Sequence, residues 1–250
     1  GYEITDNAAA VISAGDSVIE DGGVTRVEVT GDATAAQGVD LNAYSANVDF
    51  DVRDTAENIA DNSGSLGKAD EVFVISGGNA VDVAEAQAIQ GLAGYQTGAS
   101  EYEIEDNSAA IISATDSTLA NGNIHVDVTN TVGASDGAML ASFTADVEFD
   151  VVDDANAVAA EVTGIGNTLD DLDEAVDVVV SGGDVTAAEA AAIQQISEYK
   201  ASPSNYEITD DAAAVISAGT SVIEDGGVTR VEVTDDASAA QGVDLNAYSA

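Results

Sequence analysis

The sequence has no cysteine, no tryptophan, one histidine (His125) and one proline (Pro203). Without cysteine, disulfide bonds and thiolate metal sites are excluded. The scarcity of proline argues against a disordered linker, in which proline is usually enriched. No apolar run approaches the roughly 18 residues of a membrane-spanning helix, so we expect no membrane insertion.

Basic residues are also scarce. Five of them (Arg26, Arg53, Lys68, Lys200 and Arg230) stand against 47 aspartates and glutamates, which gives a formal net charge of −42. This charge excludes nucleic acid and anionic membrane surfaces as natural partners. Such charge often accompanies disorder, but 45% of the residues are apolar and they recur periodically. We therefore expect a packed core.

The chain is built from tandem repeats. The segment 2–14 returns at 102–114 and again at 206–218, so a unit of about 100 residues lies inside a larger repeat of about 204. Residues 206–250 match residues 2–46 at all but four positions, which are Asn7/Asp211, Asp16/Thr220, Gly31/Asp235 and Thr34/Ser238. We interpret the chain as a window on a longer array, with repeat units at 1–101, 102–205 and, truncated, 206–250.

Strands and helices are predicted to alternate within each unit. In the first unit the pattern predicts strands at 2–5, 24–30, 48–52 and 71–76, and helices at 8–19, 33–43, from 54 onward and at 83–92. Asp6 is predicted to cap the first helix, and Gly22-Gly23 to end it. The segment 54–57 resembles a capping box that opens the third helix.

Strands that alternate with helices predict an α/β fold with a parallel sheet. Two arrangements satisfy this pattern: an α/β solenoid, which we favour, or a series of compact α/β domains of about 100 residues. The solenoid leaves one sheet face open to water, which fits the alternation at 48–52. One buried face should then hold Val27, Val29, Val48, Phe50, Val52, Val72 and Val74, packed against Val11, Ile12, Ile59 and Ile89.

Two sequence features resemble a known class of repeats. Each unit begins with Tyr-x-Ile-x-Asp, and residues 181–190 read Ser-Gly-Gly-Asp-Val-Thr-Ala-Ala-Glu-Ala. Together they resemble the repeats of very large acidic secreted surface proteins of bacteria, including marine cyanobacteria. The resemblance covers essentially the whole chain and implies an adhesive or surface-layer component at the cell surface, often with calcium. The glycine-rich nonapeptide of calcium-binding toxin-type repeats is absent, so that calcium mechanism is not carried over.

The residues offer little chemistry for an enzyme. His125 stands near the position of Arg26 in its repeat and is predicted to be an exposed strand residue rather than a catalyst. The segments 76–79 and 181–184 follow strands and precede helices, but they lack the Gly-x-Gly-x-x-Gly spacing of a phosphate loop. We expect ordinary strand-to-helix turns there, and no enzymatic activity.

Carboxylates offer a possible cation site. Asp49/Asp51 and Glu148/Asp150 are two residues apart, hence about 7 Å apart on one strand face. That spacing overlaps the range used by inverting glycosidases, but acids are everywhere in the chain and a solvated face is the better interpretation. Oxygen-rich clusters suit Ca²⁺. Possible Ca²⁺ ligands are Asp49, Asp51, Glu148, Asp150, Asp170, Asp171, Asp173 and Glu174, although the 170–174 cluster lacks EF-hand spacing.

The fourth strand of each unit differs from the others because its outward positions are apolar. Phe73, Ile75 and, in the second unit, Val179 form one apolar patch per unit on an acidic face, which predicts an assembly contact. The sequence thus predicts a structural building block of an extracellular filament, surface layer or adhesin stalk, whose partners are copies of itself or neighbouring repeats. The alternative is a ligand-binding adhesin repeat that recognises a surface or glycan and depends on calcium.

Overall fold

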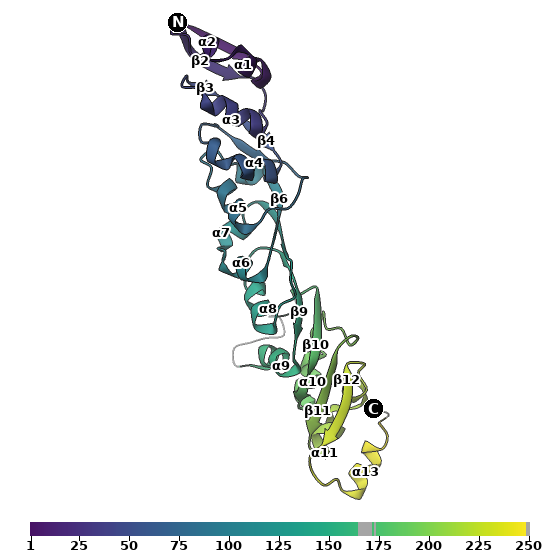
Figure 1. Ribbon diagram of the computed structural model, residues 1–250. Coiled ribbons are helices and arrows are strands. Elements are labelled where there is room, and N and C mark those ends of the chain that lie inside the picture. Colours follow the sequence, from purple (N-terminus) through teal and green to yellow (C-terminus); the bar gives the residue numbers. More distant parts are fainter. Residues whose placement is uncertain (165–171, 173, 249–250) are drawn as a thin grey trace. The chain divides into compact units, whose positions relative to one another are not determined.

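The computed structural model describes residues 1–164, 172 and 174–248 (Figure 1). It confirms the α/β class, with short parallel sheets that alternate with helices. The continuous solenoid and the repeat-unit boundaries stay predictions. Asp170, Asp171 and Asp173 lie outside the described residues.

The elements follow one another in strict order. The strands are β1 (Tyr2–Asp6), β2 (Val24–Val29), β3 (Val48–Asp49), β4 (Val52–Asp54), β5 (Val72–Val74), β6 (Glu101–Asp106), β7 (Asn123–Val128), β8 (Val147–Glu148), β9 (Asp150–Asp153), β10 (Asp177–Val185), β11 (Asn205–Asp210) and β12 (Val228–Val233). The longer helices are α1 (Ala8–Ala14), α3 (Ala35–Ala43), α4 (Ala56–Asn62), α5 (Val83–Gln90), α6 (Ser108–Ser113), α8 (Ala134–Ala141), α9 (Ala155–Thr163), α10 (Ala187–Ile193), α11 (Ala212–Ala218) and α13 (Ala239–Leu245). Single turns form α2 (Asp16–Ile19), α7 (Asp116–Leu119) and α12 (Thr220–Ile223), and two 3₁₀ turns cover Ser63–Ser65 and Thr97–Ala99.

The chain divides into two compact units. The first comprises Gly1–Asp106, Ser113–Asp127 and Thr144–Asp146, and the second comprises Asn107–Ile112, Val128–Phe143 and Val147–Ala250. In the first unit, the parallel order β1-β2-β3 follows the sequence, and β4 pairs with β5. In the second, the order is β12-β11-β10-β9, again parallel. Within each of these sheets, strands that are consecutive in the chain lie next to each other.

Single parallel bridges extend this pairing between the named strands. In the first unit they join Ala33 to Val52, Val72 to Tyr95 and Val81 to Ile104. In the second unit they join Val132 to Val151 and Val178 to Tyr199. These bridges pair residues that lie 19 to 23 residues apart in the sequence.

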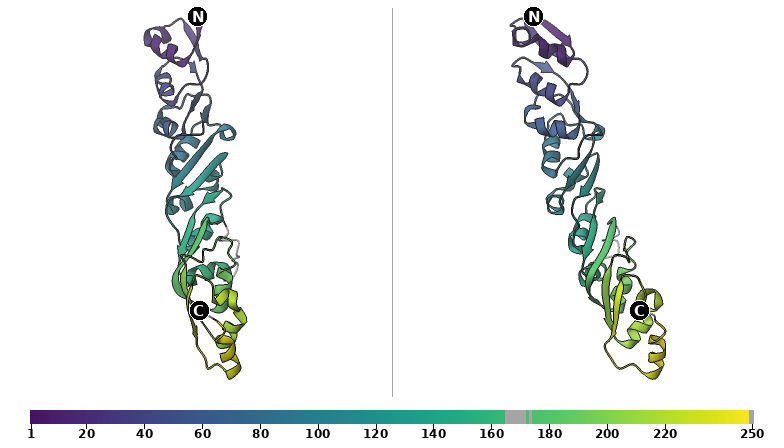
Figure 2. Two further views of the ribbon diagram at one scale, coloured as in Figure 1. Left: turned by 90° about the vertical axis from the view of Figure 1, so that its right-hand side faces the viewer. Right: turned by 45° about the vertical axis from the view of Figure 1, so that its right-hand side comes forward.

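The helices of each unit lie along one side of its strands, and consecutive helices pack together (Figures 1 and 2). In β2, Val27 and Val29 are buried, whereas the side chains of Arg26 and Glu28 are about half exposed. The same alternation recurs in β6, where Tyr102 and Ile104 are buried. One sheet face carries the core, and the other faces solvent.

The predicted core is confirmed in all but one residue. Val27, Val29, Val48, Phe50, Val52, Val72 and Val74 are buried, together with Val11, Ile59 and Ile89. Ile12 is only partly buried. The aliphatic and aromatic residues on alternate strand positions thus form the packed layer between sheet and helices, as period-2 patterning requires.

Local features differ from the prediction in several places. Thr55 caps α4 by accepting a bond from the Asn58 amide, without the predicted capping box, and α2 ends at Ile19, before Gly22-Gly23. The helix expected at 8–19 is broken into α1 and α2 at Gly15, whose φ of 71° is open to glycine but not to a helical residue. The cap of α1 is Asn7, which accepts a bond from the Ala10 amide, and not Asp6. The strand expected at 48–52 is divided into β3 and β4, because its first half pairs with β2 and its second half with β5.

Two kinds of coil alternate along the chain. In one kind, here called the Asp coil, the strand ends in an aspartate and a capped helix follows: β1–α1, β4–α4, β6–α6, β9–α9 and β11–α11. The other kind, here called the box coil, comprises β2–α3, β5–α5, β7–α8, β10–α10 and β12–α13. Its helices begin with a capping box, except α8, whose N-cap residue Gly133 has no side chain to form one. Each 100-residue unit is therefore two coil pairs of about 50 residues.

Candidate functional site

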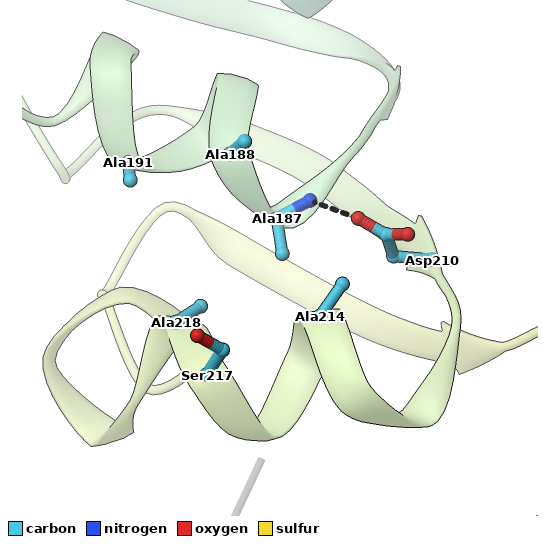
Figure 3. A pocket seen from close by; sticks show the side chains of 7 residues that line it. All are labelled: Ala187, Ala188, Ala191, Asp210, Ala214, Ser217 and Ala218. Carbon is cyan, nitrogen blue, oxygen red and sulfur yellow. Dashed lines mark hydrogen bonds between the residues drawn. The ribbon is translucent and has the colours of Figure 1, made fainter.

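The recurring polar feature of the molecule is a carboxylate that joins one coil to the next. In an Asp coil, the terminal aspartate of the strand accepts a hydrogen bond from the first amide of the preceding box-coil helix. The donor–acceptor pairs are Ala35 N to Asp54 Oδ2 (2.9 Å), Val83 N to Asp106 Oδ2 (3.2 Å), Ala134 N to Asp153 Oδ2 (2.9 Å) and Ala187 N to Asp210 Oδ2 (3.0 Å). Figure 3 shows the last of these pairs. We call Asp54, Asp106, Asp153 and Asp210 the bracket aspartates.

A bracket aspartate also accepts hydrogen bonds from residues of its own coil. The second oxygen of Asp54 accepts bonds from the Thr55 amide (2.9 Å) and from Asn58 Nδ2 (2.8 Å). Burial alone would raise the pKa of Asp54, but the bonds from Asn58, Ala35 and Thr55 outweigh it and lower the pKa. A negative charge at a helix N-terminus is also favourable for the helix dipole. Each bracket aspartate therefore connects the N-termini of two consecutive helices through one carboxylate.

The backbone around each bracket is equally regular. Ala33 N donates to Asp51 O (2.8 Å), and Arg53 N donates back to Ala33 O (2.9 Å). Val81 exchanges the same two bonds with Glu103 and Glu105, both at 3.0 Å. Val132 does so with Asp150 at 2.9 Å and with Val152 at 2.8 Å. The contact between a box coil and the following Asp coil is thus one interface used repeatedly.

An aromatic residue four positions before the aspartate fills this interface, in one of two forms. Tyr102 and Tyr206 each accept a bond on their hydroxyl from a glutamine of the preceding helix, Gln90 and Gln194, at 2.8 Å. Phe50 and Phe149 instead lie against a glycine of the preceding helix. A Cβ added at Gly38 would lie 3.5 Å from the Phe50 ring, and a Cβ added at Gly137 would lie 3.3 Å from the Phe149 ring.

A small groove lies beside the last bracket. Alanines of α10 and α11 line it together with Ser217 and Asp210 (Figure 3). The Asp210 carboxylate turns toward the Ala187 amide that it caps. The groove is the space left where two alanine-faced helices pack, and its one charged group is engaged in a structural bond.

The open sheet face is rich in carboxylates, and the basic residues lie among them. Arg26 pairs with Asp49, and that carboxylate raises the pKa of the guanidinium. Arg230 lies 2.9 Å from Glu207 and 2.6 Å from Glu232. Lys200 lies 3.0 Å from Asp177. The face therefore has local ion pairs within a large excess of negative charge.

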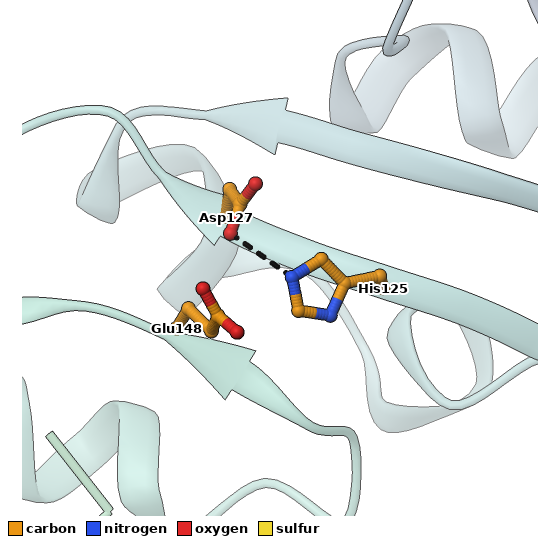
Figure 4. Close-up of side chains that lie close together, drawn as sticks. All are labelled: His125, Asp127 and Glu148. Atoms are coloured by element: carbon orange, nitrogen blue, oxygen red, sulfur yellow. Dashed lines mark ion pairs between the residues drawn. The ribbon is translucent and has the colours of Figure 1, made fainter. Parts of the chain in front are cut away.

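His125 lies on β7 at the position of Arg26 and Arg230. Its Nε2 is 3.2 Å from Asp127 Oδ1 (Figure 4). On the neighbouring strand, the pKa of Glu103 is raised by its hydrogen bond with Asp127 and by burial. An imidazole thus stands where the other two copies carry a guanidinium; Glu148, also drawn, belongs to the second unit.

The predicted cation ligands are placed as follows. Asp49 pairs with Arg26, and Asp51 accepts a bond from the Glu71 amide at 3.1 Å. Asp70 lies near both, and burial together with Asp49 and Asp51 raises its pKa. Glu148, Asp150 and Glu174 are exposed. The calcium site stays a prediction. Sequence reasoning gave no signal for Asp70, because this residue lies about 20 residues after Asp49 and Asp51 in the chain.

The residues of the predicted assembly patch are only partly exposed to solvent. Phe73 is half-buried, and the Arg53 guanidinium lies 4.4 Å from its ring centroid. Arg53 also pairs with Asp32 at 2.6 Å. Ile75 is 38% exposed, and Val179 is half-buried. The role of Phe73, Ile75 and Val179 as an assembly contact stays a prediction.

Sequence reasoning did not single out the bracket aspartates, although a signal was present. The pattern aromatic-x-aliphatic-x-Asp occurs at 2–6, 50–54, 102–106, 149–153 and 206–210. Comparison with protein-family models, curated proteins and solved structures gives no match to the chain. None of the helices in the described part of the chain has the length and apolarity that a membrane span requires.

Proposed function

We propose that the chain is a structural building block of an extracellular bacterial filament, surface layer or adhesin stalk, and that it acts through length and assembly rather than catalysis. The observation that carries the proposal is the repeated interface between a box coil and the following Asp coil. An interface that recurs with the same bonds can be extended coil after coil, which is the property a spacer needs.

Charge and composition support the same proposal. A net charge of −42 keeps neighbouring arrays apart in solution, so lateral contact requires screening or bound cations. Like charges about 4.8 Å apart on adjacent strands repel by about 0.8 kcal/mol even at the dielectric constant of water. Saline surroundings or Ca²⁺ on the open face would reduce this repulsion, and the acidic face provides oxygen ligands for it.

Array length provides the test. Residues 47–250 can be appended to the chain in register, because 206–250 repeat 2–46. If the coils form one continuous solenoid, each added coil lengthens the array by about 4.8 Å along the sheet. Small-angle scattering and electron microscopy should show a stiff rod whose length grows in proportion to coil number. Flexibly linked beads of about 100 residues would contradict the solenoid and the spacer role.

A further inference from the structure

The neighbouring strands β6 and β7 bring an imidazole and two carboxylates together on the outer face of the first compact unit. His125 Nε2 lies 3.2 Å from Asp127 Oδ1 (Figure 4), and the Asp127 carboxylate is hydrogen-bonded to that of Glu103. Glu103 and His125 also line one hollow of the surface, beside Gly77 and Asn123. Three side chains that can bind a metal ion are therefore adjacent, next to a space that water can enter.

The other two copies of this strand pair carry an arginine at the position of the imidazole. In the third copy, the Arg230 guanidinium lies 2.9 Å from Glu207 and 2.6 Å from Glu232. These two glutamates stand where the middle copy has Glu103 and Asp127. One positive group thus pairs with two carboxylates at once in the third copy. The middle copy keeps both carboxylates but has no guanidinium at this position.

We propose that His125, Asp127 and Glu103 bind a divalent transition-metal ion of the Zn²⁺ type. Imidazole nitrogen is a common ligand of Zn²⁺, Cu²⁺ and Ni²⁺, whereas Ca²⁺ and Mg²⁺ take oxygen ligands. Two ligand atoms on a tetrahedral Zn²⁺, with bonds of about 2.0–2.2 Å, are about 3.4 Å apart. The separation of 3.2 Å between His125 Nε2 and Asp127 Oδ1 is close to this value. Water from the hollow completes the coordination.

Electrostatics favours an ion at this place. Two carboxylates in contact repel each other unless a proton or a cation lies between them, and an imidazole lone pair beside a carboxylate oxygen has the same need. A doubly charged ion bound to all three groups meets both needs, as the guanidinium does in the third copy. The His125 and Asp127 side chains are 40% and 33% exposed, so an ion can reach them from solvent. The inference does not depend on the spacer role.

The sole histidine of the chain makes the test specific, because imidazole signals in an NMR spectrum report on this site alone. Zn²⁺ added to the full chain, with Mg²⁺ in large excess, should shift both carbon-bound proton signals of the His125 ring until they saturate. Ca²⁺ at the same concentration should leave them in place, because diffuse screening acts on the whole acidic face. His125→Arg reproduces the other two copies, so it should keep the circular dichroism spectrum and lose the tightest Zn²⁺ site seen by calorimetry.

A matched pair of variants separates the site from general charge. Glu103→Gln removes a ligand, and Glu3→Gln removes the same charge from the equivalent position of the first copy. Glu103→Gln should weaken Zn²⁺ binding more than about tenfold, since loss of even a residue that only supports a ligand typically costs roughly 10- to 100-fold. Glu3→Gln should leave the affinity unchanged, and circular dichroism should show that both variants are folded.

The third copy allows the site to be built anew. Arg230→His combined with Glu232→Asp reproduces the three ligands around Glu207, so this double variant should show a second imidazole that responds to Zn²⁺. A second imidazole without a response would contradict the ligand set. The proposal is also overturned if the His125 signals do not respond to Zn²⁺ in excess Mg²⁺, or if Glu103→Gln and Glu3→Gln bind Zn²⁺ equally well.

Discussion

Replacing Asp54 by alanine should open the contact between α3 and α4. The Asp54 carboxylate accepts bonds from the Ala35 and Thr55 amides and from Asn58 Nδ2, at 2.8–2.9 Å. Ala35 is fully buried, so its amide would lose its acceptor and have no direct access to water. An unsatisfied buried amide costs about 1–3 kcal/mol, and loss of a helix cap about 0.5–2 kcal/mol.

The combined loss is about 2–4 kcal/mol, less than the sum over separate bonds because one carboxylate makes them all. Amide hydrogen exchange measures it locally. Protection of the Ala35 amide should fall by about 30- to 700-fold, the equivalent of that free energy. Asp61→Ala is the matched control, since it removes the same charge from an exposed position of α4. Equal exchange at Ala35 in the two variants would refute the bracket.

The same carboxylate predicts a pH dependence. Its pKa is lowered in the folded chain, because the bonds from Asn58, Ala35 and Thr55 outweigh burial. A lowered pKa contributes stability that is fully present above the unfolded value of about 3.9 and is lost as the pH falls through the folded value. The difference between the unmodified chain and Asp54→Ala should therefore be constant near neutrality and shrink below about pH 4.

Four further outcomes are expected. Phe50→Ala should lower the free energy of unfolding in urea by about 3–5 kcal/mol by leaving a cavity, and a loss under about 1 kcal/mol would contradict its 2% exposure. Asp235 accepts a bond from the first amide of α11 at 2.8 Å, so Asp235→Gly should destabilise the third copy by about 0.5–2 kcal/mol; an unchanged thermal melt would argue against this cap. Millimolar Ca²⁺ should raise the melting temperature beyond Na⁺ at equal ionic strength, whereas equal values would leave only screening. Phe73→Asp should preserve the circular dichroism spectrum but abolish fibres, and unchanged fibres would dismiss the apolar patch.

The sequence was sufficient for the alternation of strands and helices and for the buried face. Val48, Phe50 and Val52 occupy alternate positions between aspartates, and this period-2 pattern determines which side chains enter the core. The same reasoning placed Asp49 and Asp51 on the outer face. Patterns within one strand or one helix are local, so they can be recognised without knowing which strands pair.

The contacts between coils were harder to predict because they join residues far apart in sequence. Ala35 and Asp54 belong to different coils, and nothing in either segment alone names the other as its partner. The division of the first helix at Gly15 depends on a backbone angle that the Ala-rich pattern does not reveal. Likewise, Arg26 neutralises Asp49 only because β2 and β3 pair in register. Part of the predicted cation site is thereby already occupied by a guanidinium.

The alternation of Asp coils and box coils has a consequence for how such an array changes length over generations. Loss of a single Asp coil by recombination would set two box-coil helices side by side, with no carboxylate for the first amide of the earlier helix. Loss or gain of a pair restores every bracket. Slippage between copies therefore keeps the brackets in steps of about 50 residues, keeps the aromatic contacts as well in steps of about 100 residues, and is damaging at a step of one coil. Tandem genes encoding this fold should vary among strains by whole pairs.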